Sequence, residues 1–153
     1  ERPPILIGGS GERRTLRIAA EHAVEWNMSS APPDAYAHKV EVLERHCEDI
    51  GRDPASIRRS IMTFGAVGPD RRSVEVAMDH MGRMFPGSGS YDDRLAAARE
   101  RGTIAGTTDQ AIDQLGRLGE LGLDEIIFQH DDFDNDDVPE YLASEVVPQV
   151  AGL

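Results

Sequence analysis

The chain has 153 residues, of which 28 are acidic and 16 are lysine or arginine, so its formal net charge at pH 7 is −12. A surface this acidic disfavours nucleic acid as a partner, because phosphates require a basic surface. No stretch approaches the roughly 20 apolar residues of a membrane span and no signal peptide is visible, so we expect a cytoplasmic protein without membrane contact. The single cysteine, Cys47, precludes an internal disulfide and a thiolate zinc cluster.

The first predicted element is a short apolar strand that runs into a glycine-rich turn. Residues 5–7 read Ile-Leu-Ile after a pair of prolines, and the turn that follows is Gly8, Gly9, Ser10 and Gly11. Glycines let the backbone approach a ligand closely, and the amides of a helix opening at Ser10 would attract an anion. The turn is therefore a candidate phosphate-binding loop, although these residues by themselves allow a plain strand-to-helix turn equally well.

Two well-known phosphate loops do not match this turn. A Rossmann fingerprint needs a third glycine near Arg14, and a Walker loop needs Gly-Lys before Ser or Thr, where this chain has Arg13 and Arg14 before Thr15. The helix that follows has a narrow face of small apolar residues, which predicts that it lies close on a sheet. That face consists of Leu16, Ala19, Ala20 and Ala23.

The rest of the chain alternates predicted strands with predicted helices, about four times in all, which argues for parallel βα units. We expect further strands at residues 24–28, 57–67 and 124–128. We expect helices after Pro33 and after Asp70, and then at residues 92–101, 107–121 and 138–150. Residues 86–90 are the one linker-like run, and an ordinary connection is favoured there over a mobile loop.

Helical spacing also predicts which side chains are buried. The helix after Pro33 places one apolar face inward, made of Tyr36, Val40, Leu43, Cys47 and Ile50. Because Cys47 lies on that face, a buried core thiol is favoured over a nucleophile. The helix after Asp70 buries Val74, Ala77, Met78 and Met81. Thr107 and Gln110 have the spacing of a capping box at the start of a later helix.

Several of these segments together resemble the bacterial luciferase-like monooxygenase superfamily, whose members are flavin- or F420-dependent oxidoreductases built on a (β/α)8 barrel. The resemblance rests on segments spread along nearly the whole chain: Pro-Ile-Leu-Ile-Gly-Gly-Ser-Gly at 4–11, Leu-Arg-Ile-Ala-Ala at 16–20, Trp-Asn at 26–27, Gly-Thr-Thr-Asp-Gln at 106–110 and Leu-Gly-Glu-Leu-Gly-Leu-Asp-Glu-Ile at 118–126. It implies redox chemistry carried by a flavin or deazaflavin that lies in the barrel mouth.

Length limits how much of that barrel is present. A full (β/α)8 barrel usually needs about 250 residues, with roughly 200 as the lower end, so 153 residues are too few. We predict one α/β domain over residues 1–153, in which parallel βα units form the C-terminal half of a TIM-type (β/α)8 barrel. An open half-barrel leaves sheet edges and an apolar inner face uncovered. Its expected partner is therefore the missing N-terminal half or a second copy of the chain.

The resemblance also implies where a cofactor is held. The family's glycine turn contacts the cofactor's chain or phosphate, and the end of the next strand lies near it. In this chain these positions are Gly8, Gly9, Ser10, Gly11, Asn27 and Met28. The family usually has Asp-Gly where this chain has Val24-Glu25, which removes a flexible glycine beside the pocket. F420 is preferred over FMN as the cofactor because the glycine turn and the Ala-Ala pair most resemble F420-dependent actinobacterial members.

No metal site or catalytic residue is assigned. The acidic run at residues 130–137 invites comparison with a calcium loop, but the required glycine is Asp137 and the required glutamate is Ala143, so an EF-hand is rejected. A solvated acidic loop that caps the last helix explains the run better. The family's acid/base groups come largely from the first half of the barrel, which this chain lacks.

The preferred hypothesis is the cofactor-cradling C-terminal part of an F420- or FMN-dependent oxidoreductase or monooxygenase that acts on a small-molecule substrate and is inactive without its N-terminal half. The alternative, from a different class, is a non-catalytic half-barrel module that self-associates into a dimer. Under that alternative, Gly8 to Gly11 is only a turn. A phosphosugar-binding half-barrel shares the glycine turn but leaves the other matching segments unexplained.

Overall fold

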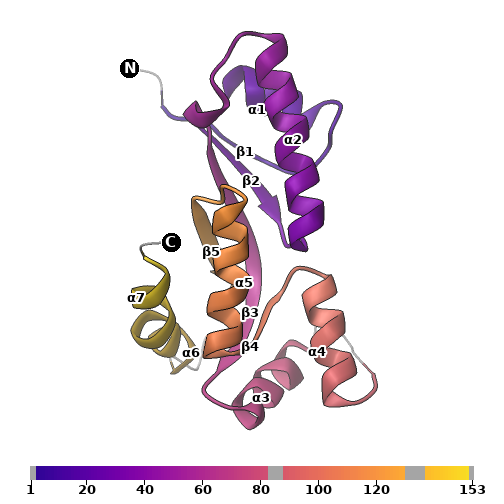
Figure 1. The fold of residues 1–153 in the computed structure, drawn as a ribbon, viewed down its shortest axis with the longest axis vertical. Helices are drawn as coiled ribbons and strands as arrows, with labels where there is room; N and C mark the ends of the chain where they lie inside the picture. The colour runs from indigo at the N-terminus through magenta and orange to yellow at the C-terminus, as the bar shows by residue number, and fades with distance from the viewer. Residues whose placement is uncertain (1–2, 83–87, 130–136, 152–153) are drawn as a thin grey trace.

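The computed structural model describes residues 3–82, 88–129 and 137–151 (Figure 1). The strands are β1 Leu6–Gly8, β2 Glu25–Ser29, β3 Arg58–Gly68, β4 Ile104–Thr107 and β5 Glu125–Gln129. The helices are α1 Thr15–His22, α2 Pro33–Asp49, α3 Arg71–Met81, α4 Tyr91–Glu100, α5 Thr108–Glu120, α6 Asp137–Tyr141 and α7 Val147–Val150, with a 3-10 turn at Pro54–Ser56 and a π-helical turn at Leu142–Val146. Among the described residues, none of these helices has the length and apolar character that crossing a membrane requires.

All strand pairs in the sheet are parallel, and β3 is its centre. The first half of β3 pairs with β2 from Arg58 to Met62, while residues from Ser60 to Phe64 pair with β5. Because β2 and β5 share partners on β3, they lie on its opposite edges. β1 pairs with β2 on the far side. The parallel strands follow the order β1-β2-β3-β4, with β5 also paired to β3, and helices separate them along the chain. This confirms the predicted α/β fold of βα units.

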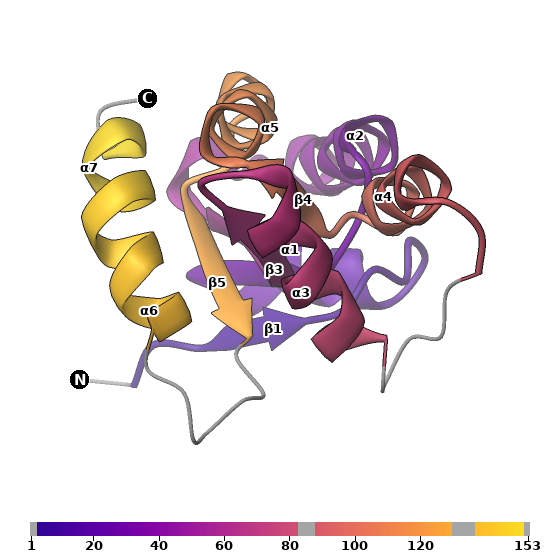
Figure 2. The same ribbon diagram turned by 90° about the horizontal axis from the view of Figure 1, so that it is seen from below.

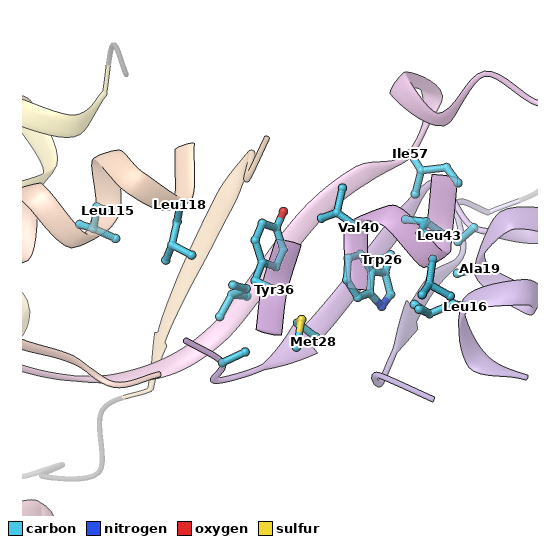
Figure 3. Close-up of a cluster of buried hydrophobic side chains, with 14 of the residues drawn as sticks. Leu16, Ala19, Trp26, Met28, Tyr36, Val40, Leu43, Ile57, Leu115 and Leu118 are labelled. Atoms are coloured by element: carbon cyan, nitrogen blue, oxygen red, sulfur yellow. The ribbon is translucent and has the colours of Figure 1, made fainter. Parts of the chain in front are cut away.

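The two faces of the sheet differ in what covers them. Trp26 and Met28 of β2 are buried against α1 and α2 on what we call the helix face. The ring of Trp26 stacks on Tyr36 of α2, with centroids 6.2 Å apart (Figure 3). Side chains alternate along a strand, so Glu25 and Asn27 lie on the opposite face, which we call the open face. Strand register places the following residues on the open face with them: Leu6, Arg58, Ser60, Met62, Glu125 and Ile127.

A second, smaller core lies at the far end of β3. The last residues of β3 pair with β4, and α3 and α4 pack on this part of the sheet. The buried side chains of this core are Ala66, Val74, Met78, Met81, Leu95, Ala98 and Ala105. At the other edge, α6 and α7 run beside β5 (Figures 1 and 2). The second core therefore lies at the C-terminal end of β3, and the C-terminal helices lie at the β5 edge of the sheet.

Several predicted details are confirmed. The predicted small face is fully buried at Leu16, Ala19 and Ala20 of α1 and at Ala23 directly after it, which lets this helix lie close to its neighbours. Cys47 is buried in the main core. The capping box at the start of α5 forms between Thr107 and Gln110. Residues 130–136 of the acidic run and residues 86–87 of the linker-like run lie outside the described residues.

Other details differ from the prediction. β4 was not predicted, because four residues with a glycine among them carry no periodic signal, and only the ladder along Gly65 to Gly68 of β3 defines the strand. Ile50 is 49% exposed because the helix ends at Asp49. The last predicted helix is interrupted by the π-helical turn. The helix after the glycine turn begins at Thr15 rather than at Ser10.

Candidate functional site

The glycine turn is attached firmly to the neighbouring strand. Gly9 has φ +121°, a conformation that side chains other than glycine rarely adopt. Its backbone N–H donates to the carbonyl of Asn27 at 2.8 Å, and its carbonyl accepts from the indole Nε1 of Trp26 at 2.8 Å. Because Trp26 is buried in the main core, these bonds attach the turn to the core.

The turn leaves open space beside its first glycine. A Cβ placed on Gly8 would meet nothing within 4 Å, so this side of the strand end is free to receive another molecule. On Gly11, by contrast, a Cβ would lie 2.9 Å from the hydroxyl of Thr15. Ser10 and Gly11 are exposed and precede the helix, so their amides belong to an open turn and not to the helix N-terminus that the sequence predicted. Among the glycines of the turn, Gly8 is the one with unobstructed space beside it.

Asn27 lies next to this space, whereas Met28 does not. Gly8 pairs with Asn27 in the parallel ladder, so both lie on the open face. The side chain of Met28 is 4% exposed and belongs to the main core, where Figure 3 shows it near Trp26 and Tyr36. Of the two predicted positions at the end of β2, only Asn27 therefore offers a side chain on the face of Gly8. The side chain of Met28 is accounted for by packing.

Two further residues hold Asn27 in place. The amide Nδ2 of Asn27 donates to Oγ of Ser60 at 2.8 Å, and the Ser60 hydroxyl donates to Oε1 of Glu25 at 2.6 Å. Sequence reasoning missed Ser60, because it belongs to a strand about thirty residues away and only the register of β2 on β3 brings it opposite Asn27. Because Nδ2 is engaged in this chain of bonds, the Asn27 side chain has a fixed orientation.

The far end of the turn is anchored to α2. The carboxylate of Glu12 accepts from Lys39 and contacts His38 at 3.0 Å, and the carbonyl of Glu12 lies 2.8 Å from Nε2 of His46. The hydrogen bonds from Lys39 and His38 hold the pKa of Glu12 below its ordinary value. Both ends of the turn are thus tied to secondary structure, as a pre-formed binding loop requires.

The described residues contain no cluster of three or more His, Cys, Asp or Glu side chains that could hold a metal ion. Cys47 is not a candidate nucleophile, since burial raises the pKa of its thiol.

The structure also has a cavity that the glycine turn does not line. A cavity of about 670 Å³ lies at the C-terminal ends of β3 and β5, between α3 and the C-terminal helices.

Comparison with known proteins identifies the relatives of this fold. Residues 1–125 match the model of a family described as luciferase-like monooxygenase. Among curated proteins, the chain is 33% identical over 78 residues to a phthiodiolone/phenolphthiodiolone dimycocerosates ketoreductase from Mycobacterium sp. (strain JLS). That match covers 50% of this chain and 20% of the ketoreductase.

Solved structures show the same fold over most of this chain. The F420-dependent tetrahydromethanopterin reductase from Methanopyrus kandleri superposes with a TM-score of 0.74 at 19% identity, over 96% of this chain and 51% of the reductase. The EDTA monooxygenase from Chelativorans sp. BNC1 gives 0.75 at 17% identity, over 98% and 44%. The oxygenating constituent of 3,6-diketocamphane monooxygenase from Pseudomonas putida, solved with FMN, gives 0.66 at 14% identity, over 98% and 50%. The chain thus has the fold of about half of a TIM-type barrel, as predicted.

Proposed function

The chain belongs to the luciferase-like monooxygenase family, and we propose that it is the C-terminal, cofactor-cradling part of an F420- or FMN-dependent oxidoreductase. It spans about half the length of the solved structures that it matches. On this proposal the N-terminal half of the barrel supplies the acid/base groups, and the chain alone is inactive. The cofactor, when bound, supplies hydride transfer or flavin–oxygen chemistry, and the protein supplies binding and orientation.

The observation that carries the proposal is the open space beside Gly8, next to an oriented Asn27 and on a turn tied down at both ends. A group bound there would meet the backbone of Gly9, Ser10 and Gly11, whose lack of bulk allows close approach. Asn27 would present its carboxamide to the same group. Met28 would contribute only backbone.

F420 remains the preferred cofactor, and FMN the other candidate. Both cofactors occur in the names of the matching structures, one an F420-dependent reductase and another a complex with FMN. The preference for F420 rests on the glycine turn and the Ala-Ala pair of this sequence. The substrate on this proposal is a small molecule, and the reaction is a reduction, an oxidation or an oxygenation.

Gly8→Val tests the cofactor site with little cost to the fold, because the new side chain would enter open space in a strand. The matched control is Gly119→Val in α5, where a Cβ also meets nothing within 4 Å. In the full-length protein that carries this chain, affinities for F420 and FMN are measured by fluorescence titration, with thermal unfolding as a check on folding. We expect Gly8→Val to weaken cofactor binding by at least about tenfold through lost access to the turn, and Gly119→Val to leave it unchanged. Equal affinities in the two variants would count against the site.

One observation favours the second candidate, a self-associating module without catalysis. The open face exposes three large apolar side chains, Leu6 at 52%, Met62 at 36% and Ile127 at 38%. Exposed apolar surface of this kind is typical of an interface. A native mass spectrum distinguishes the two candidates. A dimer of this chain that retains neither F420 nor FMN would favour the module, whereas a complex with an N-terminal piece that retains either cofactor would favour the oxidoreductase.

A further inference from the structure

We propose that Glu25 and Ser60 are positioning residues, which fix the side chain of Asn27 so that its oxygen binds a hydroxyl group of the cofactor. That hydroxyl belongs to the chain that joins a flavin or deazaflavin ring to its phosphate. This inference rests on the proposed function, since it assigns one contact within the same cofactor site. The direction of two hydrogen bonds and the position of Asn27 in the sheet lead to it.

The three side chains form a series of hydrogen bonds whose direction is determined at its carboxylate end. An ionised carboxylate has no proton to donate and can only accept. The Ser60 hydroxyl therefore donates its single proton to Oε1 of Glu25, and the length of 2.6 Å is typical of a charge-assisted bond. Since that proton is used, Ser60 can offer Asn27 only a lone pair. Asn27 accordingly directs its donor atom, Nδ2, to Ser60 at 2.8 Å.

Burial makes this direction unfavourable to reverse. Ser60 is fully buried, so water cannot take the place of either of its two partners. If the carboxamide of Asn27 turned over, its oxygen would face the oxygen of Ser60, and the Ser60 hydroxyl would have to give up its bond to Glu25 or remain opposite a second acceptor. A buried polar group that loses its partner is destabilising. Glu25 thus determines the orientation of Asn27 through Ser60.

The same arrangement leaves the oxygen of Asn27 available to a ligand. β2 lies between β1 and β3, and Nδ2 of Asn27 is directed to Ser60 on β3. The two heteroatoms of a carboxamide diverge from one carbon, so Oδ1 is directed away from β3, and the strand on that side is β1. There Gly8 is opposite Asn27, and a Cβ on Gly8 would meet nothing within 4 Å. In the part of the chain that the structure describes, Oδ1 accepts no hydrogen bond.

An acceptor oxygen at this point favours a hydrogen-bond donor and disfavours an anion. A phosphate beside Oδ1 of Asn27 would bring two acceptors together, near the negative charge of Glu25. The donors of the site lie on the turn instead, where the backbone amides of Ser10 and Gly11 donate to no acceptor among the described residues. FMN and F420 both carry hydroxyl groups on the chain between ring and phosphate. One of these hydroxyls would donate to Asn27 while the phosphate meets the turn.

The test compares ligands that differ only in these hydroxyls. One ligand is FMN and the other is FMN with its chain hydroxyls replaced by hydrogen, and a second pair carries the ring of F420. Affinities are measured by fluorescence titration of the full-length protein that carries this chain, with thermal unfolding as a check on folding. We expect wild type to bind the hydroxylated ligand of a pair about fivefold more tightly or better, as one hydrogen bond allows.

Two variants interrupt the series of hydrogen bonds at different points. Glu25→Gln keeps the shape of the side chain, but its amide can donate to Ser60, which frees the Ser60 proton for Asn27. Ser60→Ala removes the link itself. We expect each variant to reduce the preference for the hydroxylated ligand by about threefold or more, because the orientation of Asn27 is no longer determined.

Glu125→Gln is the matched control. Glu125 lies on the same open face, opposite Ser60 in the ladder of β3 and β5, and its carboxylate pairs with Arg58 at 2.9 Å. This variant removes the same charge as Glu25→Gln and should keep the wild-type preference.

The outcomes separate this inference from the proposed function. If Glu25 and Ser60 only support the fold, their variants weaken both ligands of a pair alike and the preference stays as in wild type, which would overturn the inference. A wild type that binds the cofactor without preferring the hydroxyls, or an equal loss of preference in Glu125→Gln, would overturn it as well. A wild type that binds neither F420 nor FMN would overturn the proposed function and, with it, the ligand assigned to Asn27.

Discussion

Gly102 is the position at which one added methyl group should cost most stability. It precedes β4, has φ +82°, and lies against the segment that follows β2. A Cβ built on it would lie 2.2 Å from the backbone nitrogen of Ala31 and 2.4 Å from its carbonyl carbon. The carbonyl of Gly102 also accepts a buried hydrogen bond from the Thr63 hydroxyl at 2.9 Å. Because the clashing atoms are backbone, Gly102→Ala can be accommodated only by separating the segment before β4 from the end of β2.

The cost of Gly102→Ala has two parts. A side chain at a left-handed φ costs roughly 1–2 kcal/mol. Forcing extra volume into a packed site, with the backbone shift that follows, costs typically about 1–3 kcal/mol. Together these give about 2–5 kcal/mol, a large fraction of the roughly 5–15 kcal/mol by which most proteins are stable.

Gly51 and Gly119 distinguish the conformational cost from the cost of the clash when their alanine variants are compared with Gly102→Ala. Gly51 has φ +69° but nothing within 4 Å of a Cβ, so Gly51→Ala carries the conformational cost of about 1–2 kcal/mol without a clash. Gly119 lies in α5 with open space around it, so Gly119→Ala should stabilise by up to about 1 kcal/mol. Urea unfolding of the three variants gives the free energies of unfolding. The reasoning is refuted if Gly102→Ala loses no more stability than Gly51→Ala.

Three further predictions concern single side chains. The hydroxyl of Tyr36 is buried with no hydrogen-bond partner among the described residues, so Tyr36→Phe should be neutral or stabilise by up to about 1 kcal/mol in urea unfolding. A decrease of more than about 1 kcal/mol in the free energy of unfolding would reveal a hydrogen-bond partner. The buried thiol of Cys47, whose pKa burial raises, should react with a disulfide reagent in native protein at least about a hundredfold more slowly than in denaturant, and comparable rates would contradict its burial. Hydrogen bonds from Lys39 and His38 lower the pKa of Glu12, so its contribution to stability is present above the ordinary glutamate pKa and is lost as pH falls through the lowered value. The difference in unfolding midpoint between wild type and Glu12→Gln should therefore shrink in acid, and a difference that stays constant with pH would refute this.

Much of the fold is encoded in local patterns. The small face of α1, the capping box of α5 and the buried position of Cys47 were all predictable, because helical spacing selects which side chains meet a sheet. The family resemblance could also be recognised from the sequence, because each matching segment is a short continuous stretch of the chain. Local signals of this kind require no knowledge of which strand pairs with which.

The candidate site was only partly predictable. The glycine turn was recognisable from its composition, and Asn27 from its place after Trp26. The partners of Asn27, and the difference between Asn27 and Met28, depend on strand register and on which face of β2 packs against the helices. Sequence alone did not determine that face, because buried and open positions alternate along a strand with the same period of two.

What the sequence by itself determined is the alternation of strands and helices and the location of the glycine turn, since both depend on residues adjacent in the chain. The tertiary structure decided the existence of β4, the hydrogen-bonded series from Asn27 to Glu25, and the cavity between α3 and the C-terminal helices. Each of these joins residues that are far apart in sequence. A four-residue strand has no periodicity of its own, and a cavity wall belongs to no single element, so both are defined only when the long strand β3 brings distant segments to the same end of the sheet.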